Sequence, residues 1–523
     1  MLPSELEEVL DQRAPFQRAP FQRDDGNAWL KLAWEMVDAQ RWELAIACFH
    51  QTVQLLPDIV EAWANLGSLH RRLEQFEESI ACFRQAVSRH PSNIELHIAM
   101  ATSMRQGGFR TDAIAVCDAA LKQSPESSEL WMLLGNVLQE TDAFDRAIDA
   151  IERGILLAGR TPQNVSCLGI AKFRRGDVEQ AVTFFQESIG LDPAFADAHF
   201  HLGMALLLTE NYQQGWDEYE WRPGGRRRPV RRSSIPMWDG RPLAANQTLM
   251  LVAEQGLGDT VQLVRLATEL KYRYGCKIVF QSPRALIPLL STCKGIDRFI
   301  ARDDAVPIID CFLPLASLPS LLRYCPNNSK QPSPYITPDP LRLDQWKDAL
   351  DRKLSSTPGD NNKNIRIGLS WQGDPKFPAD HCRSIPLKFL LPLTKIPKTT
   401  WISLQKGYGT EQLKANSDSK SLIDFGDQLD AEGGAFQDTL ALMHQLDLVI
   451  TSDTAVAHVA GAGGIPVWIA ISYVPDWRWN LHRPDSAWYS SARLFRQTTL
   501  GDWKSVVNDM HAELDSFPMC NVG

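Results

Sequence analysis

The first half of the chain repeats itself, and this repetition limits what it can fold into. From Pro57 to Pro91 and again to Pro125 the step is 34 residues, and Pro193 keeps the same register. Small residues form a second register, at Ala45, Ser79, Ala113, Ala147 and Ala181. A proline stops a helix, and a small residue lets two helices approach closely. The period therefore predicts helix pairs that bury their apolar faces only against their neighbours.

Large side chains occupy a third register, and glycines a fourth. The short sequences WANLG and WMLLG place Trp63 beside Gly67 and Trp131 beside Gly135. We predict about six helix pairs over residues 28–222, with the aromatic rings packed in the core. The pattern W-x-x-L-G at this period resembles the tetratricopeptide repeat. Because such arrays present an extended groove, we expect a protein or peptide partner there.

Composition excludes several classes of function. With 523 residues, 44% of them hydrophobic and a net charge of -9, the chain is predicted to hold several globular domains and no nucleic-acid site. No apolar run is long enough for a membrane span, so a cytoplasmic location is expected, with peripheral membrane contact left open. Residues 1–27 are predicted to be a flexible lead-in. The ten cysteines lack metal-binding spacing, so no metal is expected.

The second half alternates short apolar runs with helix-like stretches. The runs are TLMLVAE, KIVFQS, DCFLPL, IRIGLSW, TWISLQ, LDLVITSD and PVWIAI. This alternation predicts parallel α/β sheets. Breaks in the pattern give a linker at residues 223–244, one unit at 245–350, a second linker at 351–363 and another unit at 364–520. The arginines at 226–228, 231 and 232 favour a solvated linker over a docking segment. Two facing units would bring the carboxyl ends of both sheets to one cleft.

The strongest local signal is the sequence SDTAVAHVAGAGG, which follows a buried strand. Asp453 or Thr454 is a natural N-cap, so the first-turn N–H groups of the next helix would point into the cleft as a seat for a diphosphate. Ala455 keeps its side chain small, and His458 lies one turn later. The alternative interpretation is a capped helix with a packed histidine.

Two further loops carry candidate ligands for a phosphate or a nucleotide. The loop after IGLSW presents Lys376, Arg383 and Ser384, of which Arg383 is favoured because its planar guanidinium suits phosphate. Gln405 and Lys406 follow another strand and suit ribose or phosphate contacts, although alone this signal is weak. A solvated run of charges remains the alternative for the first loop.

The loop AEQGLGDT is different because it combines glycines with carboxylates. A glycine-rich turn exposes amides to anions, but Glu254 and Asp259 would repel a phosphate. We therefore predict an acceptor loop, in which Gln255, Gly256 and Gly258 approach the acceptor and Asp259 is the base that takes its proton. Glu254 has no predicted role.

Together, AEQGLGDTVQ, LSWQGDP, RSIPL, SLQKG and TSDTAVAHVAGAGGIPVW resemble the glycosyltransferase domain of the heptosyltransferase-like family, glycosyltransferase family 9, fused behind tetratricopeptide repeats. The overall plan is also similar to that of protein O-linked N-acetylglucosamine transferases. The resemblance implies a GT-B fold of two facing Rossmann-like units and metal-independent, inverting transfer from a nucleotide-diphosphate sugar. On the family's motifs fall Asp453, Thr454, Ala455 and His458 for the donor, Gln405 and Lys406 for the nucleotide, Arg383 for the diphosphate and Asp259 as base. Ala455 replaces the usual glycine, so heptose is not supported as the sugar.

The sequence thus predicts a glycosyltransferase that needs no cofactor besides its sugar donor and acts on protein side chains or on a glycan. Two alternatives stay open. One is an inactive repeat scaffold that binds a nucleotide sugar, and the other is a nucleotide-sugar epimerase, for which a peptide-binding array would have no evident use.

Overall fold

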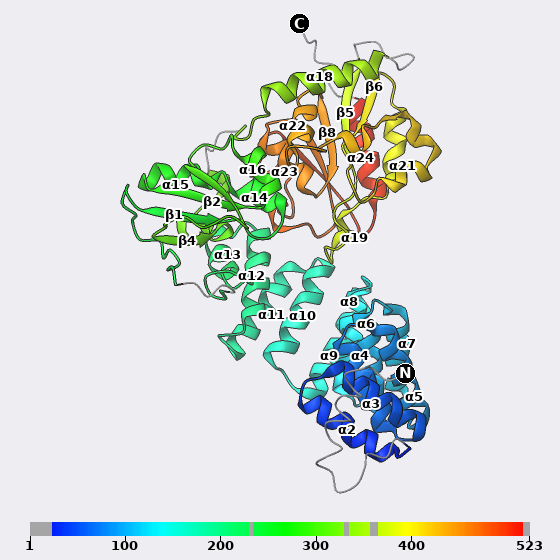
Figure 1. Cartoon of the computed structure of the whole chain (residues 1–523). Coiled ribbons are helices and arrows are strands. Elements are labelled where there is room, and N and C mark those ends of the chain that lie inside the picture. The colour runs from blue at the N-terminus through cyan, green and yellow to red at the C-terminus, as the bar shows by residue number, and fades with distance from the viewer. Residues whose placement is uncertain (1–23, 230–233, 329–333, 356–363, 516–523) are drawn as a thin grey trace. The chain divides into compact units, whose positions relative to one another are not determined.

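The computed structural model describes residues 24–229, 234–328, 334–355 and 364–515 (Figure 1). The chain forms two compact units, residues 1–193 and 194–523. Their positions relative to one another are not determined, so each is described by itself. Most of the predicted lead-in lies outside the described residues. In the described ranges, no helix combines the length and the apolar character that crossing a bilayer requires.

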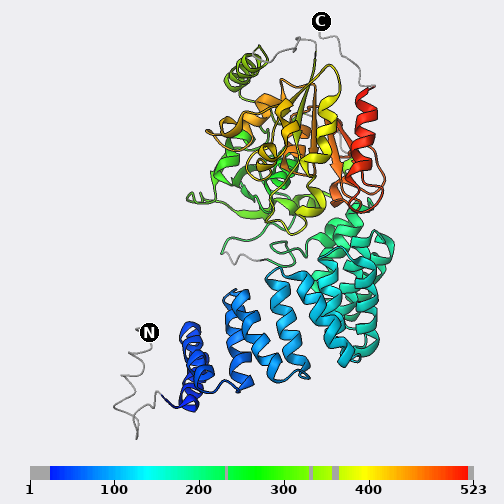
Figure 2. The same cartoon turned by 90° about the vertical axis from the view of Figure 1, so that its right-hand side faces the viewer.

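Antiparallel helix pairs make up the first unit, stacked one after another from blue to cyan in Figure 2. The pairs are α2 (Gly26–Asp38) and α3 (Trp42–Leu55), α4 (Val60–Arg72) and α5 (Phe76–Arg89), α6 (Ile94–Gln106) and α7 (Arg110–Gln123), α8 (Ser128–Gln139) and α9 (Phe144–Ala158), α10 (Pro162–Arg175) and α11 (Val178–Leu191). A sixth pair, α12 (Ala196–Leu208) and α13 (Tyr212–Tyr219), belongs to the second unit. The predicted repeats are confirmed.

The glycine register sets the spacing within a pair. A Cβ added to Gly67 would lie 2.9 Å from the Phe83 ring, and one added to Gly169 would lie 2.7 Å from the Phe185 ring. Both rings are fully buried. The absence of a side chain at these positions therefore lets the partner helix place its aromatic ring directly against the backbone.

The proline and aromatic registers are joined by hydrogen bonds. The indole N–H of Trp63 donates to the carbonyl of Pro57, and that of Trp131 to the carbonyl of Pro125, each at 2.8 Å. These carbonyls lie just beyond the ends of α3 and α7, where the chain turns. The ring thus supplies a hydrogen-bond donor to a carbonyl of the turn, in addition to packing against its neighbours.

Two parallel sheets form the second unit, as predicted. The first contains β1 (Thr248–Val252), β2 (Lys277–Ser282), β3 (Arg298–Ala301) and β4 (Cys311–Pro314) in the order β3-β2-β1-β4. The second contains β5 (Ile365–Ser370), β6 (Thr399–Ser403), β7 (Leu422–Ile423), β8 (Leu448–Ser452), β9 (Val467–Ile471) and β10 (Ala492–Arg496) in the order β10-β9-β8-β5-β6-β7. Every pairing within these sheets is parallel.

The strand order creates one switch point in each sheet. Successive strands run outward from β1 through β2 to β3, and then the order jumps to β4 on the other side. In the second sheet the same reversal falls between β5 and β8. Open parallel sheets bind their ligands beyond the carboxyl ends of the strands at such a point. The ends of β5 and β8, and those of β1 and β4, are therefore the places to look for a site.

The carboxyl edges of the two sheets meet. Helix α14 (Leu257–Leu263) starts directly after β1, helix α23 (Ala455–Ala462) starts directly after β8, and the two helices pack against each other. Gly258 is the point of closest approach, because a Cβ there would lie 2.7 Å from the His458 ring and 3.4 Å from the Cα of Ala455. The loop that carries Asp259 thus lies at the first turns of α23.

Helix α18 (Pro340–Ser355) packs against the second sheet's α22 (Gln437–Met443), although the predicted boundary at 350 groups it with the first sheet. Arg342 pairs with Asp438, and the Trp346 ring meets Phe425 edge to face at 5.1 Å. An apolar stripe predicts that a segment is helical, but it carries no information about which sheet the helix covers.

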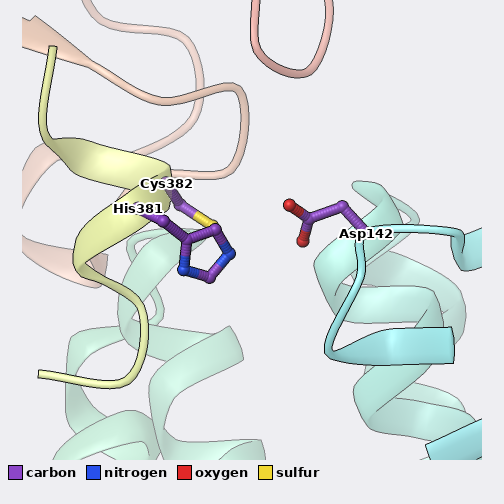
Figure 3. Close-up of side chains that lie close together, drawn as sticks. All are labelled: Asp142, His381 and Cys382. Carbon is purple, nitrogen blue, oxygen red and sulfur yellow. The ribbon is translucent and has the colours of Figure 1, made fainter. Parts of the chain in front are cut away.

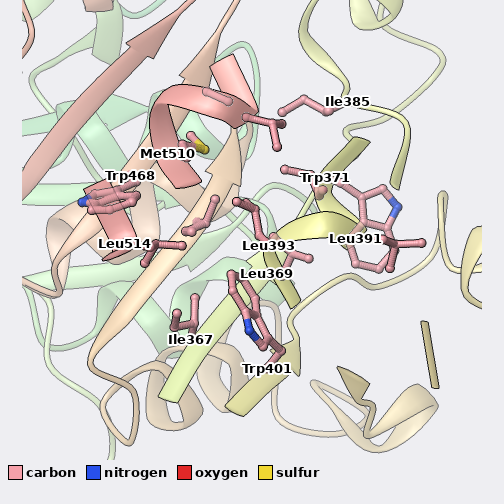
Figure 4. Packing of buried hydrophobic residues seen from close by; sticks show 14 of the residues in the cluster. Ile367, Leu369, Trp371, Ile385, Leu391, Leu393, Trp401, Trp468, Met510 and Leu514 are labelled. Atoms are coloured by element: carbon pink, nitrogen blue, oxygen red, sulfur yellow. The ribbon is translucent and has the colours of Figure 1, made fainter. Parts of the chain in front are cut away.

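A tryptophan-rich core supports the second sheet (Figure 4). Trp371, Trp401 and Trp468 are buried around β5, β6 and β9, and Met510 joins them from α24 (Trp503–Asp515). Burial of a large aromatic side chain stabilises a fold by about 1.5–3 kcal/mol. The ends of β5 and β8 are therefore held by a rigid support.

Candidate functional site

The start of α23 leaves backbone donors open. Strand β8 ends at Ser452, and Thr454 takes the N-cap position with an extended backbone. Its side chain does not cap the helix, and its hydroxyl lies 3.5 Å from that of Thr451. In the described part of the chain, the N–H groups of Ala455 and Val456 meet no carbonyl. Open N–H groups at a helix start suit an anion, and the predicted diphosphate seat stays a prediction.

Asp453 adjoins this turn and is electrostatically unusual. Burial, together with the nearby charge of Asp476, raises the pKa of Asp453 to about 6, although Arg383 and Arg478 act in the opposite direction. A carboxyl group whose pKa lies near neutrality can gain or lose a proton during a reaction, and such groups cluster at functional sites.

Arg383 is held in place near α23. Its Nε donates to Asp380 Oδ1 at 3.1 Å, and its guanidinium lies 4.4 Å from the centre of the Phe377 ring. The same Asp380 accepts a hydrogen bond from the Ser384 hydroxyl at 2.8 Å. The charge of Arg383 lowers the pKa of Asp453, whereas Lys376 is exposed. Of the two predicted cations, Arg383 is the one whose charge acts on Asp453, and its role at the diphosphate stays a prediction.

His381 and Cys382 adjoin Arg383 on α19 (Asp380–Arg383), where the Cys382 Sγ lies 3.2 Å from the His381 Nε2 (Figure 3). Asp142, also drawn in Figure 3, belongs to the first unit. Because the two units are not placed relative to one another, these three residues define no metal site.

Gln405 and Lys406 brace loops. The Gln405 Oε1 accepts from the backbone N–H groups of Trp371 and Gln372 at 2.8 and 3.0 Å, and its Nε2 donates to the Tyr408 carbonyl at 2.7 Å. The Lys406 ammonium donates to a backbone carbonyl, that of Asp430, at 2.6 Å. Gln405 therefore shapes the loop after β5 and has little capacity left for a ligand.

His458 is a packed histidine. Its Nδ1 lies 3.0 Å from the Tyr489 hydroxyl, and its ring stacks on Trp479 with centroids 5.3 Å apart. Burial, reinforced by the charge of Arg478, lowers the pKa of His458 well below its usual range. The neutral ring forms the surface against which Gly258 packs.

Asp259 is fixed by two contacts. Its Oδ2 accepts a hydrogen bond from the Gly256 N–H at 2.6 Å, and its Oδ1 forms an ion pair with Arg478. Arg478 is 7% exposed and Asp259 is 22% exposed, so the carboxylate can be reached from solvent while the cation cannot. Burial would lower the pKa of Arg478, but the charges of Asp259 and Asp476 raise it overall. This buried arginine therefore stays charged beside the predicted base.

Glu254 and Gln255 are committed to internal contacts. Glu254 pairs with Arg222 at 2.5 Å and accepts from the Ala316 N–H at 3.0 Å, while the Gln255 amide donates to the Tyr219 hydroxyl at 3.0 Å. Burial raises the pKa of Glu254 despite its arginine partner. Glu254, which had no predicted role, is a structural anion, and Arg222 is the partner that sequence reasoning missed.

In its described part, the basic segment after α13 pairs with the last helix pair and then reaches one strand. Arg226 pairs with Glu220 at 2.9 Å, and Arg228 pairs with Asp197 at 2.7 Å. Further along, the backbone of Met237 bridges to β4. The arginines at 231 and 232 lie outside the described residues. Docking, the less favoured of the two predicted interpretations, applies to the described part.

Fold and site define a class: a helical-repeat array joined to two parallel α/β sheets whose carboxyl edges meet at a group of charged residues. The profile of the tetratricopeptide repeat matches residues 60–93, and a second profile of the same repeat matches 98–165 and 168–219. Residues 60–93, 98–165 and 168–219 thus consist of tetratricopeptide repeats. Repeats of this kind suggest a protein partner.

Comparison with known proteins gives one relative by sequence and several solved structures of repeat proteins. Protein FlbA of Caulobacter vibrioides is 25% identical over 418 residues, covering 74% of this chain and 67% of FlbA. An alignment of that length extends beyond the repeats into the α/β part. A thermophilic repeat protein of Thermus thermophilus shares 18% identity, with a TM-score of 0.29, over 35% of this chain and 100% of its own. A tetratricopeptide repeat protein from Parabacteroides merdae shares 16%, with a TM-score of 0.35, over 37% and 77%.

Proposed function

We propose that this protein is a metal-independent, inverting glycosyltransferase of the GT-B type. It would move a sugar from a nucleotide-diphosphate sugar to a protein side chain or glycan that the repeats help to recruit. One observation carries the proposal. Through Gly258, the turn that bears Asp259 packs against Ala455 and His458 at the start of α23. This contact brings a carboxylate from one sheet to the anion-binding helix end of the other.

The second sheet offers what a departing diphosphate needs. The open N–H groups of Ala455 and Val456 lie at the positive end of α23, and Arg383 adds a positioned cation on the same side. Fixed donors and charges that face a developing negative charge are among the largest contributions to catalysis. With these groups in place, no metal ion is required to stabilise the leaving group.

The first sheet offers the base. Asp259 would take the proton of the acceptor hydroxyl as the acceptor oxygen bonds to the anomeric carbon, while the bond from that carbon to the diphosphate oxygen breaks. Each carboxylate oxygen has more than one acceptor position, so the contacts with Gly256 and Arg478 leave capacity for the acceptor hydroxyl. Attack and departure on opposite faces of the sugar invert its configuration.

A nucleotide screen followed by mass spectrometry tests this function. The full-length chain would be melted with UDP, GDP, ADP, CDP and dTDP, because a ligand that binds the native state at 100 times its Kd stabilises it by about 2.7 kcal/mol. It would then be incubated with UDP-N-acetylglucosamine, UDP-glucose, GDP-mannose and dTDP-rhamnose and a cell extract, and the proteins and glycans analysed for an added sugar. A thermal shift with sugar transfer supports the proposal, whereas the absence of both contradicts it.

A further inference from the structure

The switch point of the first sheet is filled by the chain itself. Arg222, which follows α13, is fully buried. Its guanidinium pairs with Glu254 after β1 and donates to the hydroxyl of Ser317 after β4 at 3.0 Å. These two strands border the reversal in strand order. The position where an open sheet would hold a ligand is thus occupied by the end of the last repeat.

Tyr219 connects the same segment to the loop that bears Asp259. Its hydroxyl and the Gln255 amide exchange hydrogen bonds at 3.0 and 3.3 Å. Gln255 has a positive φ of 60°, which is unfavourable for this residue type unless its surroundings hold it. The next residue, Gly256, donates to Asp259. Tyr219 therefore fixes the turn directly before the carboxylate.

A second route reaches Asp259 from the other sheet. The rings of Trp216 and Tyr219 pack edge to face on Trp477, with centroids 5.1 and 5.9 Å apart. Trp477 in turn lies under the guanidinium of Arg478, at 4.1 Å, and Arg478 forms the ion pair with Asp259. Tyr219 thus contacts both Gln255 of the acceptor loop and Trp477, the aromatic support of the buried cation.

We propose that the last repeat helix is a working part of the catalytic centre, and that Tyr219 is a positioning residue for Asp259. The expected effect on turnover rests on the proposed function. The expected effect on the conformation of the acceptor loop does not, because Tyr219 contacts the loop without any substrate. The last repeat helix and the transferase are then not separable modules, because that helix determines where the base lies.

Tyr219→Phe tests this by removing a single oxygen, with Tyr274→Phe, which packs against Trp238, as the matched control. Hydrogen–deuterium exchange of residues 253–262 in the full chain needs no ligand. We expect exchange there to be about 10-fold faster in Tyr219→Phe, because a local contact that holds the loop is lost, and unchanged in the control. Equal exchange in wild type and Tyr219→Phe would overturn the inference.

Turnover gives a second readout, with whichever of the four nucleotide sugars the wild type consumes. We expect kcat to fall on the order of 10- to 100-fold in Tyr219→Phe, because a misplaced base slows chemistry, with KM for the nucleotide sugar unchanged. If Tyr219 only stabilised the fold, Tyr219→Phe would lower the fraction of protein that binds the nucleotide sugar by the same factor as the rate. An unchanged kcat overturns the inference. A wild type that consumes none of the sugars contradicts the proposed function instead, and loop exchange then decides the inference by itself.

A double-variant cycle identifies the route. If Tyr219 acts through Gln255, then Tyr219→Phe combined with Gln255→Asn is no slower than the worse single variant, since both remove the same contact. Asparagine tolerates the positive φ at this position but is too short to reach the hydroxyl. Independent, multiplying losses would overturn the route through Gln255.

Discussion

At the scale of single residues, the ion pair with Arg478 determines how Asp259 can act. The buried cation fixes the direction of the carboxylate, and the partial exposure of Asp259 leaves it accessible. Arg478 retains Asp476 as a second carboxylate partner at 2.7 Å, so it would not be left without a counter-charge if Asp259 were neutralised. The charge of Asp259 can therefore be removed without dismantling its surroundings.

Asp259→Asn should lower turnover by about 10² to 10⁴, which is the usual contribution of a general base. The thermal shift with nucleotide diphosphates should persist, because the anion-binding turn lies on the other sheet. Steady-state rates and melting curves measure the two effects separately. The matched control is Asp303→Asn, whose carboxylate is exposed and pairs with exposed Arg284. Full activity in Asp259→Asn would exclude it as the base.

Arg383 and Lys376 provide a matched pair for the leaving group. Arg383→Gln should reduce the nucleotide-induced thermal shift and weaken diphosphate binding by about 1.5–3 kcal/mol, the range for hydrogen bonds to charged groups. Lys376→Gln, which removes an exposed cation from the same loop, should change neither quantity. Calorimetric titration with UDP and GDP compares them. Equal losses in both variants would mean that only the net charge of the loop matters.

The raised pKa of Asp453 predicts a pH-dependent cost to stability. The folded pKa of Asp453, about 6, exceeds the unfolded value. The free energy of unfolding is therefore highest below the unfolded pKa, where the group is protonated in both states, and it falls as pH rises through 6. Asp453→Asn should therefore gain stability relative to wild type by about 1 kcal/mol between about pH 5 and about pH 7.5. Chemical denaturation at the two pH values measures this difference. A variant that differs from wild type equally at both would contradict the assignment.

At the scale of elements, the contact between α14 and α23 depends on the missing side chain of Gly258. Gly258→Ala would place a methyl 2.7 Å from the His458 ring, which is itself stacked and buried. We expect a loss of about 1–3 kcal/mol in stability and a lower kcat, because the helices must separate. Gly190→Ala in α11 is the control, since its Cβ meets nothing within 4 Å. Thermal melts and rates are the measurements, and a fully active, equally stable Gly258→Ala would argue against close packing there.

Elements were more predictable from the sequence than contacts. All seven apolar runs form strands, because a strand buried on both faces leaves an uninterrupted apolar signature. The three missed strands are short or charged: β3 has four residues and starts with Arg298, β7 has two residues, and β10 carries Arg493 and Arg496. The partners of Glu254 and Asp259 were missed for another reason. Arg222 and Arg478 lie 32 and 219 residues away in the chain, and no local pattern encodes such pairings.

At the scale of the whole molecule, the boundary between the two compact units lies inside the repeat array. The sixth helix pair, α12 and α13, belongs to the compact unit 194–523 together with both sheets. Its period assigns it to the array, and its buried contacts assign it to the α/β part: the indole N–H of Trp216, for example, donates to the carbonyl of Tyr324 at 2.9 Å. This helix pair thus belongs to the repeat array by sequence and to the α/β part by its contacts. Truncation can determine which of the two requires it.

Two truncations separate the alternatives. A chain of residues 194–523 should be soluble, melt cooperatively and bind nucleotide diphosphates, because it keeps the pair between Arg222 and Glu254. A chain of residues 223–523 follows the boundary predicted from the repeats, yet it leaves Glu254 buried without its cation, a defect that costs about 3–5 kcal/mol. It also uncovers the aromatic surface of Trp477. We expect the shorter chain to aggregate or to melt at a much lower temperature, which size-exclusion chromatography and calorimetry would show. If both chains fold and bind equally, α13 is only the end of the repeats, and its contacts with the two sheets contribute nothing that the α/β part requires.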